Sequence, residues 1–150
     1  MACQRAKLNL SVNVSGEEDM PQVIIHASSS IRPQDKALLV QGIRESIPRL
    51  LNVAEHIGQV MLYEIPEENR STHSTRDRRF IFVEVSMYPG RTAEMKLQFL
   101  QNLVFLINRY TGVDARDVNC VIHEIPPENY YGGVSHKYIE ELKAANKGTS

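Results

Sequence analysis

The chain lacks several features that would indicate a secreted, membrane or nucleic-acid-binding protein. Its 150 residues include only two cysteines, Cys3 and Cys120, which form no disulfide framework and fit a reducing, cytoplasmic compartment. The formal net charge is -1 at pH 7, so no basic excess favours nucleic acid or a membrane surface. No apolar run is long enough to span a bilayer, and residues 1–19 lack the apolar stretch of a signal peptide.

The common cofactor motifs are also missing. No cysteine–histidine or paired-histidine spacing indicates zinc, and no glycine-rich loop is present to hold phosphates. His26 and His123 fall in predicted strands, and we interpret them as core or surface histidines rather than metal ligands. We therefore expect neither a metal nor another cofactor. Apolar residues make up 42% of the chain, as in an ordinary globular domain.

What the chain does contain is a repeat. EIPEEN begins at Glu64 and EIPPEN at Glu124, a spacing of 60 residues (124 minus 64). With that offset, residues 21–69 align with 81–129 without a gap and share eleven identities. Roughly three would be expected by chance at average composition. We infer that the chain contains two related units; two copies are too few for a solenoid.

Each unit is predicted to be strand, helix, strand. The expected strands are 22–27, 59–65, 80–86 and 118–125. The first helix should begin near Pro33, and Pro48 should kink or shorten it. The second should follow Thr92 as N-cap and end at Gly112. Units of this kind favour parallel strands with a right-handed crossover.

The expected fold is α/β (α+β): two tandem β-α-β units form a four-stranded mixed sheet with two helices on one face. We expect a single domain over 20–145, made of repeats 20–72 and 80–133 and a C-terminal helical tail near 138–145. Residues 70–79 are a polar, basic linker. Residues 1–19 have no counterpart in the repeat, and we interpret them as a leader or a misassigned start, with Met20 as the true one.

Several of these features in register resemble the tautomerase superfamily. They are Pro21 opening the first unit, Gly90-Arg91-Thr92 before the second helix, and Glu124 followed by Asn129-Tyr130-Tyr131-Gly132-Gly133. The chain is similar to the fused two-unit members, which include malonate semialdehyde decarboxylase, rather than to 4-oxalocrotonate tautomerase with its single unit. The resemblance covers about residues 20–140 and implies a homotrimer that acts on a small carboxylate-bearing substrate.

The resemblance implies that Pro21 is the catalytic base once the initiator methionine is removed. A secondary amine in an apolar pocket has its charged form disfavoured, so its pKa falls toward the working pH. It can then move a proton between the enol and keto forms of a substrate. Within the chain as given, however, the Pro21 nitrogen is an amide and cannot be a base. The alternative interpretation of Pro21 is a proline that begins an edge strand.

The resemblance also implies substrate-binding residues. Arg91 matches the arginine that holds a substrate carboxylate, and a guanidinium suits this task because it offers two parallel donors. Tyr130 matches an aromatic wall of the pocket. Arg79 belongs to a basic cluster with Arg76 and Arg78, which is either a solvated linker or a border of the pocket that attracts an anionic substrate.

Three alternatives stay open at this point. The first alternative is a family member that has lost the chemistry and serves in binding or assembly. The second is a decarboxylase or dehalogenase. Water-adding chemistry is disfavoured because Ile57 stands where the decarboxylases have an aspartate. The third alternative is a ferredoxin-like ligand- or RNA-binding domain, which has the same order of elements. The strands lack the pair of stacking aromatics that RNA binding needs.

Overall fold

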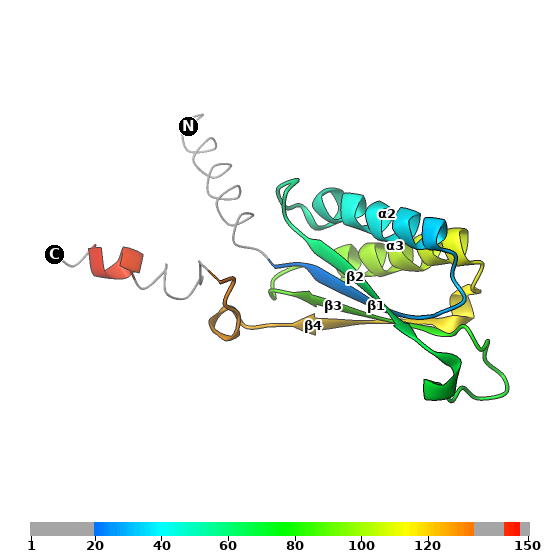
Figure 1. Ribbon diagram of the computed structural model, residues 1–150. Helices are drawn as coiled ribbons and strands as arrows, with labels where there is room; N and C mark the ends of the chain where they lie inside the picture. The colour runs from blue at the N-terminus through cyan, green and yellow to red at the C-terminus, as the bar shows by residue number, and fades with distance from the viewer. Residues whose placement is uncertain (1–19, 134–142, 148–150) are drawn as a thin grey trace.

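The computed structural model describes residues 20–133 and 143–147. Two β-α-β units follow one another along the chain (Figure 1). The first contains β1 (Gln22–Ser28), α2 (Pro33–Leu51) and β2 (Gln59–Ile65). The second contains β3 (Ile81–Met87), α3 (Ala93–Thr111) and β4 (Val118–Glu124). Short 3-10 turns η1 (Glu67–Asn69) and η3 (Pro127–Asn129) follow β2 and β4, and η2 (Ala115–Asp117) precedes β4.

The four strands form one mixed sheet in the order β2-β1-β3-β4. Within each unit the two strands are parallel, and the units join through the antiparallel pair β1 and β3, where Gln22 lies beside Ser86. The sheet therefore has two ends that correspond to each other through the duplication. The expected four-stranded mixed sheet is confirmed.

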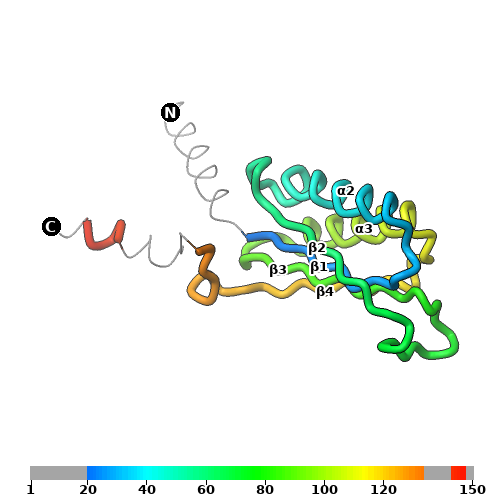
Figure 2. Tube along the Cα trace, viewed as in Figure 1, coloured from blue at the N-terminus to red at the C-terminus, as the bar shows by residue number. Residues whose placement is uncertain are grey.

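Both helices cover the same face of this sheet and run antiparallel to each other (Figures 1 and 2). Alternate strand residues point into the interface, and in β1 and β3 these are fully buried. Core residues without solvent exposure include Val23, Ile25, Val83, Phe99 and Ile107. Within the described residues, the other face carries no helix, and we call it the open sheet face. Its residues include Ile24, His26, Met61, Tyr63, Phe82, Glu84, Val121 and His123.

The ends of the helices follow their sequence signals with one exception. The Thr92 side chain caps α3 by accepting from the Met95 backbone N–H at 3.1 Å, and Gly112 ends it with a φ of 74°. The expectation that Pro48 shortens the first helix was wrong, because α2 and α3 both have 19 residues. Pro48 lies in the last turn, where only one helical hydrogen bond is lost, and its own carbonyl accepts from the backbone N–H of Asn52.

The repeated EIP segments have matching structural roles. In each unit a lysine of the helix forms an ion pair with the glutamate at the end of the closing strand. Lys96 Nζ lies 3.1 Å from Glu124 Oε1, and Lys36 pairs with Glu64 in the same way. Ile-Pro then leads into a 3-10 turn in both units. The identities in this segment are thus accounted for by the fold alone.

Candidate functional site

Pro21 lies at one end of the sheet, just before β1, and is buried. Its carbonyl oxygen accepts a hydrogen bond of 3.2 Å from the backbone N–H of Gln59, the first residue of β2. Its nitrogen is joined to Met20, which is itself only 6% exposed. In this chain the nitrogen is therefore an amide and cannot take up a proton.

Arg91 lies between β3 and α3 and is half-buried. Its Nε and Nη2 atoms donate to the carbonyl oxygen of Leu51, at 3.3 and 3.2 Å. Leu51 is the last residue of α2, so the guanidinium sits where the helix dipole favours a cation. Residues 52–58 lead from this helix end directly to Gln59, the partner of Pro21. Arg91 is thus held at the same end of the molecule as Pro21.

Tyr130 follows η3 and reaches this end as well. Its ring makes an edge-to-face contact with the ring of Tyr88, with centroids 5.9 Å apart. Tyr88 is buried and directly follows Met87, the last residue of β3. Because Gln22 lies beside Ser86 in the antiparallel register, the next step sets Pro21 beside Met87. Pro21, Arg91 and Tyr130 therefore lie at the same end of the sheet, although they are far apart in sequence.

Arg79 lies at the opposite end of the sheet, before β3 begins. Its Nη1 donates to the carbonyl oxygen of Thr111, the last residue of α3, at 3.1 Å. Its Nε and Nη2 donate to the two carboxylate oxygens of Asp77, and these hydrogen bonds hold the pKa of Asp77 below its ordinary value. Within one chain the structure does not bring Arg79 together with Pro21. Arg79 makes at α3 the contact that Arg91 makes at α2.

A polar cluster in the middle of the open sheet face was missed by the sequence reasoning. Glu84 of β3 accepts from the imidazoles of His26 on β1, at 2.7 Å, and of His123 on β4, at 3.1 Å. These two bonds, that from His26 first, hold the pKa of Glu84 below its ordinary value. The only signal in the sequence was that all three side chains alternate away from the core. Their proximity follows from the strand order, which the sequence does not specify.

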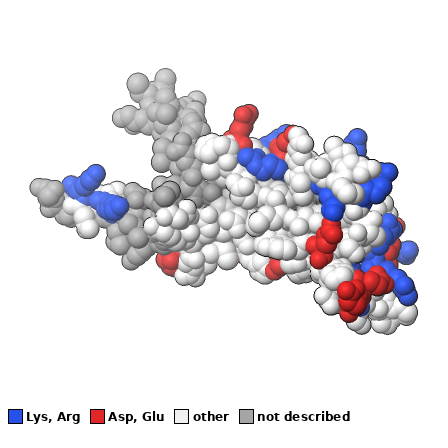
Figure 3. Space-filling view, in the orientation of Figure 1, with Lys and Arg blue, Asp and Glu red and all other residues white. Residues whose placement is uncertain are grey.

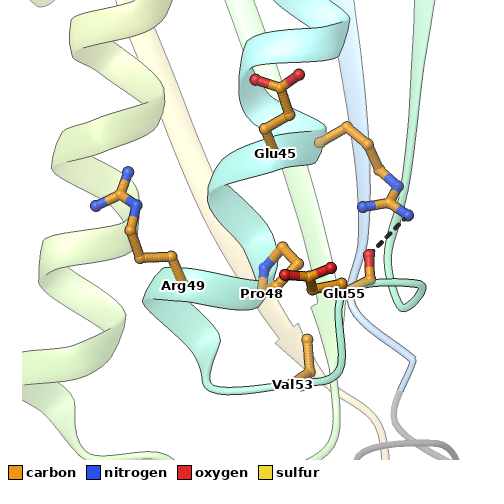
Figure 4. Close-up of a pocket in the computed structure, with 6 residues that line it drawn as sticks. Glu45, Pro48, Arg49, Val53 and Glu55 are labelled. Atoms are coloured by element: carbon orange, nitrogen blue, oxygen red, sulfur yellow. Dashed lines mark hydrogen bonds between the residues drawn. The ribbon is translucent and has the colours of Figure 1, made fainter.

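A hollow of about 490 Å³ lies beside the C-terminal half of α2 and contains none of the predicted site residues. It is lined by Arg44, Glu45, Pro48, Arg49, Val53 and Glu55. The Arg44 guanidinium donates to the backbone carbonyl of Glu55, at 3.2 Å. This hydrogen bond is the dashed line beside Glu55 in Figure 4. Its two arginines are matched by two glutamates, so it offers no excess charge to a ligand. Elsewhere, burial raises the pKa of the Cys120 thiol to about 11, which makes it a poor nucleophile at neutral pH.

The described residues contain neither a candidate metal site nor a candidate membrane-spanning helix. Within 20–133 and 143–147, no group of three or more histidine, cysteine, aspartate or glutamate side chains is arranged to hold a metal ion. In the same ranges, no helix combines the length and apolar character that crossing a membrane requires.

Comparison with known proteins gives a family match for part of the chain. Residues 60–131 match a family model described as "Tautomerase enzyme". This segment begins in the last strand of the first unit and contains Arg91 and Tyr130, whereas Pro21 lies outside it. No curated protein sequence matches the chain.

Solved structures share the fold at low sequence identity. A wild-type fused 4-OT, a symmetric trimer, is 18% identical with a TM-score of 0.70, over 76% of this chain and 93% of that one. A malonate semialdehyde decarboxylase inhibited by 3-bromopropiolate is 16% identical with a TM-score of 0.68, over 81% and 96%. Macrophage migration inhibitory factor from Toxoplasma gondii is 13% identical with a TM-score of 0.68, over 77% and 98%. The family match over residues 60–131 and this shared fold together support the tautomerase superfamily.

Proposed function

We propose that this protein is a tautomerase that moves a proton between the enol and keto forms of a small carboxylate, with the amine of Pro21 as general base. The observation that supports this is that Pro21, Arg91 and Tyr130 lie at the same end of the sheet. The active form begins at Pro21, because only then is the nitrogen a secondary amine. The superfamily match supports the class of chemistry, and the residue roles are our proposal.

The buried position of Pro21 suits this chemistry. Burial disfavours the protonated amine, so a free Pro21 amine has a pKa below the roughly 7.7–8.0 of an ordinary α-amine. The neutral amine takes the proton from the enol hydroxyl and returns it to the substrate carbon, which leaves the amine unchanged at the end of the cycle. Arg91 binds the substrate carboxylate with its planar guanidinium, and Tyr130 provides an aromatic side chain at the same end of the sheet.

Two forms of the protein test this proposal. A form that starts at Met20, and loses that methionine, should convert a simple enol acid such as phenylenolpyruvate to its keto form. The full chain should be far slower, since its Pro21 nitrogen is an amide. Intact mass of both preparations establishes where each begins. Equal activity of the two forms would rule out the amine mechanism.

The second candidate is a family member that serves in binding or assembly. It is favoured by the peptide bond between Met20 and Pro21, which blocks the amine in the chain as given. Inactivity of the Pro21-starting form on several enol acids, with its fold intact, would make this the better description. A decarboxylase or dehalogenase is less well supported, because Ile57 is apolar, only 8% exposed, and provides no acid to activate water.

We also propose that the chain is a homotrimer. The open sheet face exposes large apolar side chains, with Met61 at 47% and Tyr63 at 53%, and such a face is stabilised by burial against partners. Among structures of the same fold, fused 4-OT is described as a trimer in several cases.

A further inference from the structure

The end of the molecule opposite Pro21 carries two adjoining hollows, of about 170 and 240 Å³. They lie along the connection from β2 to β3, residues 66–80, and share Ser71, Thr72 and Phe80 as lining residues. In the space-filling view, charged side chains of both signs gather at this end (Figure 3). The charge that faces the hollows themselves is of one sign only.

The lining of both hollows is rich in hydrogen-bond donors and contains no carboxylate. Beyond the three shared residues, the polar ones are His26, Asn69, Arg70, His73, Arg76 and Asn119. Three neighbouring acids are already paired: Glu67 with Arg78 at 3.4 Å, Asp77 with Arg79, and Glu84 with His26. The hollow beside α2 differs, because glutamates balance its arginines. The end near residues 66–80 therefore has an electrostatic preference for an anion.

Arg70 provides an independent observation. Its Nη2 donates to the carbonyl oxygen of Phe80, but its Nη1 is buried and has no hydrogen-bond partner among the described residues. A buried, unsatisfied guanidinium nitrogen is costly, and such exceptions call for an explanation. Arg70 lines the smaller hollow, so an oxygen seated there lies beside its guanidinium.

We propose that these hollows bind a small organic anion, through a carboxylate or phosphate oxygen on Arg70. Ser71 and Thr72 add hydroxyl donors, and an apolar part of the ligand lies against Phe80. The Arg76 guanidinium, 6.0 Å from the centroid of the Phe80 ring, borders the second hollow.

The duplication separates this site from the proposed catalytic end. Arg70 corresponds to Tyr130 (70 plus 60), Ile81 stands where the first unit has Pro21, and Ile31 stands where the second has Arg91. This end therefore lacks both the proline and the carboxylate-binding arginine, so it binds a ligand without the proton transfer proposed for Pro21. The proposal holds whether or not the other end is active.

The test uses the full chain, whose Pro21 nitrogen is an amide, and measures binding rather than activity. Benzoate and inorganic phosphate are titrated separately while the backbone amide resonances are followed by NMR. Saturable shifts at Ser71 and Thr72 are expected with at least one anion. Tighter binding of benzoate assigns a carboxylate beside an apolar body, and tighter binding of phosphate assigns a phosphate ligand.

Matched arginine variants decide the outcome. Arg70→Gln should weaken binding about tenfold or more, since a charged hydrogen-bond donor is lost. Arg49→Gln, in the hollow beside α2, should leave it unchanged. Thr72→Val provides a second, milder variant and should weaken binding severalfold even if Arg70→Gln proves unstable. Equal binding by wild type, Arg70→Gln and Thr72→Val, or an equal loss in Arg49→Gln, would overturn the proposal.

Discussion

The clearest comparison at the scale of single residues is between Arg91 and Arg79. Both donate to the carbonyl of the last residue of a helix, Leu51 or Thr111, at the two ends related by the duplication. Their contribution to helix stability should therefore be similar. Only Arg91 lies at the end that also contains Pro21. The pair thus separates a structural role of an arginine from a role in substrate binding.

We expect Arg91→Ala, in protein that starts at Pro21, to lower kcat/KM toward an enol acid roughly tenfold or more, because a charged hydrogen bond to the carboxylate is lost. Arg91→Lys should recover only part of this, since an ammonium cannot make the paired contact. Arg79→Ala should lower the melting temperature about as much as Arg91→Ala while activity is retained. A matching loss of activity in Arg79→Ala would instead support a role for Arg79 in attracting the substrate.

Gly58 is a second residue whose environment gives a sharp expectation. A Cβ added there would lie 2.7 Å from Cγ2 of Ile47, and the backbone φ of 106° is strained for other residues. Gly90 has a similar φ of 122°, but a Cβ there would meet nothing within 4 Å. Comparison of the two glycines therefore distinguishes backbone strain, which both share, from overpacking, which affects Gly58 alone.

Gly58→Ala should therefore destabilise the fold more than Gly90→Ala, by about 1–3 kcal/mol for the additional overpacking. Chemical denaturation of both variants measures the difference in the free energy of unfolding. If the two variants lose equal free energy of unfolding, Ile47 moves aside without cost. The tight packing of α2 against the start of β2 then does not contribute to stability.

At the scale of elements, the structure predicts a pH-dependent connection between three strands. Glu84 joins β3 to β1 and β4 through His26 and His123, and its pKa is lowered in the folded state by these hydrogen bonds. A carboxyl with a depressed folded-state pKa adds stability above its unfolded pKa, roughly 4.3, and loses it as the pH falls through the folded value.

Unfolding curves of wild type and Glu84→Gln between pH 3 and 6 test this. Wild type should be the more stable at pH 6, and the difference should shrink as the solution is acidified. His123→Gln, which leaves the His26 contact in place, should show an intermediate effect. Parallel curves for wild type and Glu84→Gln over the whole range would mean that the cluster does not stabilise the sheet.

The elements were largely predictable from the sequence, because each depends on local signals. All four strands lie within about one residue of their expected bounds, and Thr92 and Gly112 delimit α3 as expected. Pro48 misled the prediction because the cost of an internal proline depends on how many helical turns follow it. Neither the Glu84 cluster nor the position of Arg79 was predicted. The cluster depends on which strands pair in the sheet, and the position of Arg79 depends on the path of the chain between the two units.

At the scale of the whole molecule, the open sheet face should mediate the proposed trimer. Tyr63→Asp places a charge on this face and should dissociate the assembly at micromolar concentration, as measured by sedimentation. Phe105→Asp is the matched control, since Phe105 is equally apolar and 61% exposed but lies on α3. A stable monomer in the wild type, or equal dissociation by Phe105→Asp, would contradict this use of the open sheet face.

The joining of the two units, which pair through β1 and β3, in one polypeptide has a genetic consequence. Because both units belong to one polypeptide, every copy of the protein holds them in a fixed one-to-one ratio. Separate single-unit chains encoded by two genes would mix at random when they assemble. Fusion removes this random mixing. In an assembly of identical fused chains, a mutation in one unit is therefore present in every copy of that unit. Ile31 and Ile81 are departures of this kind, each confined to one half of the duplication.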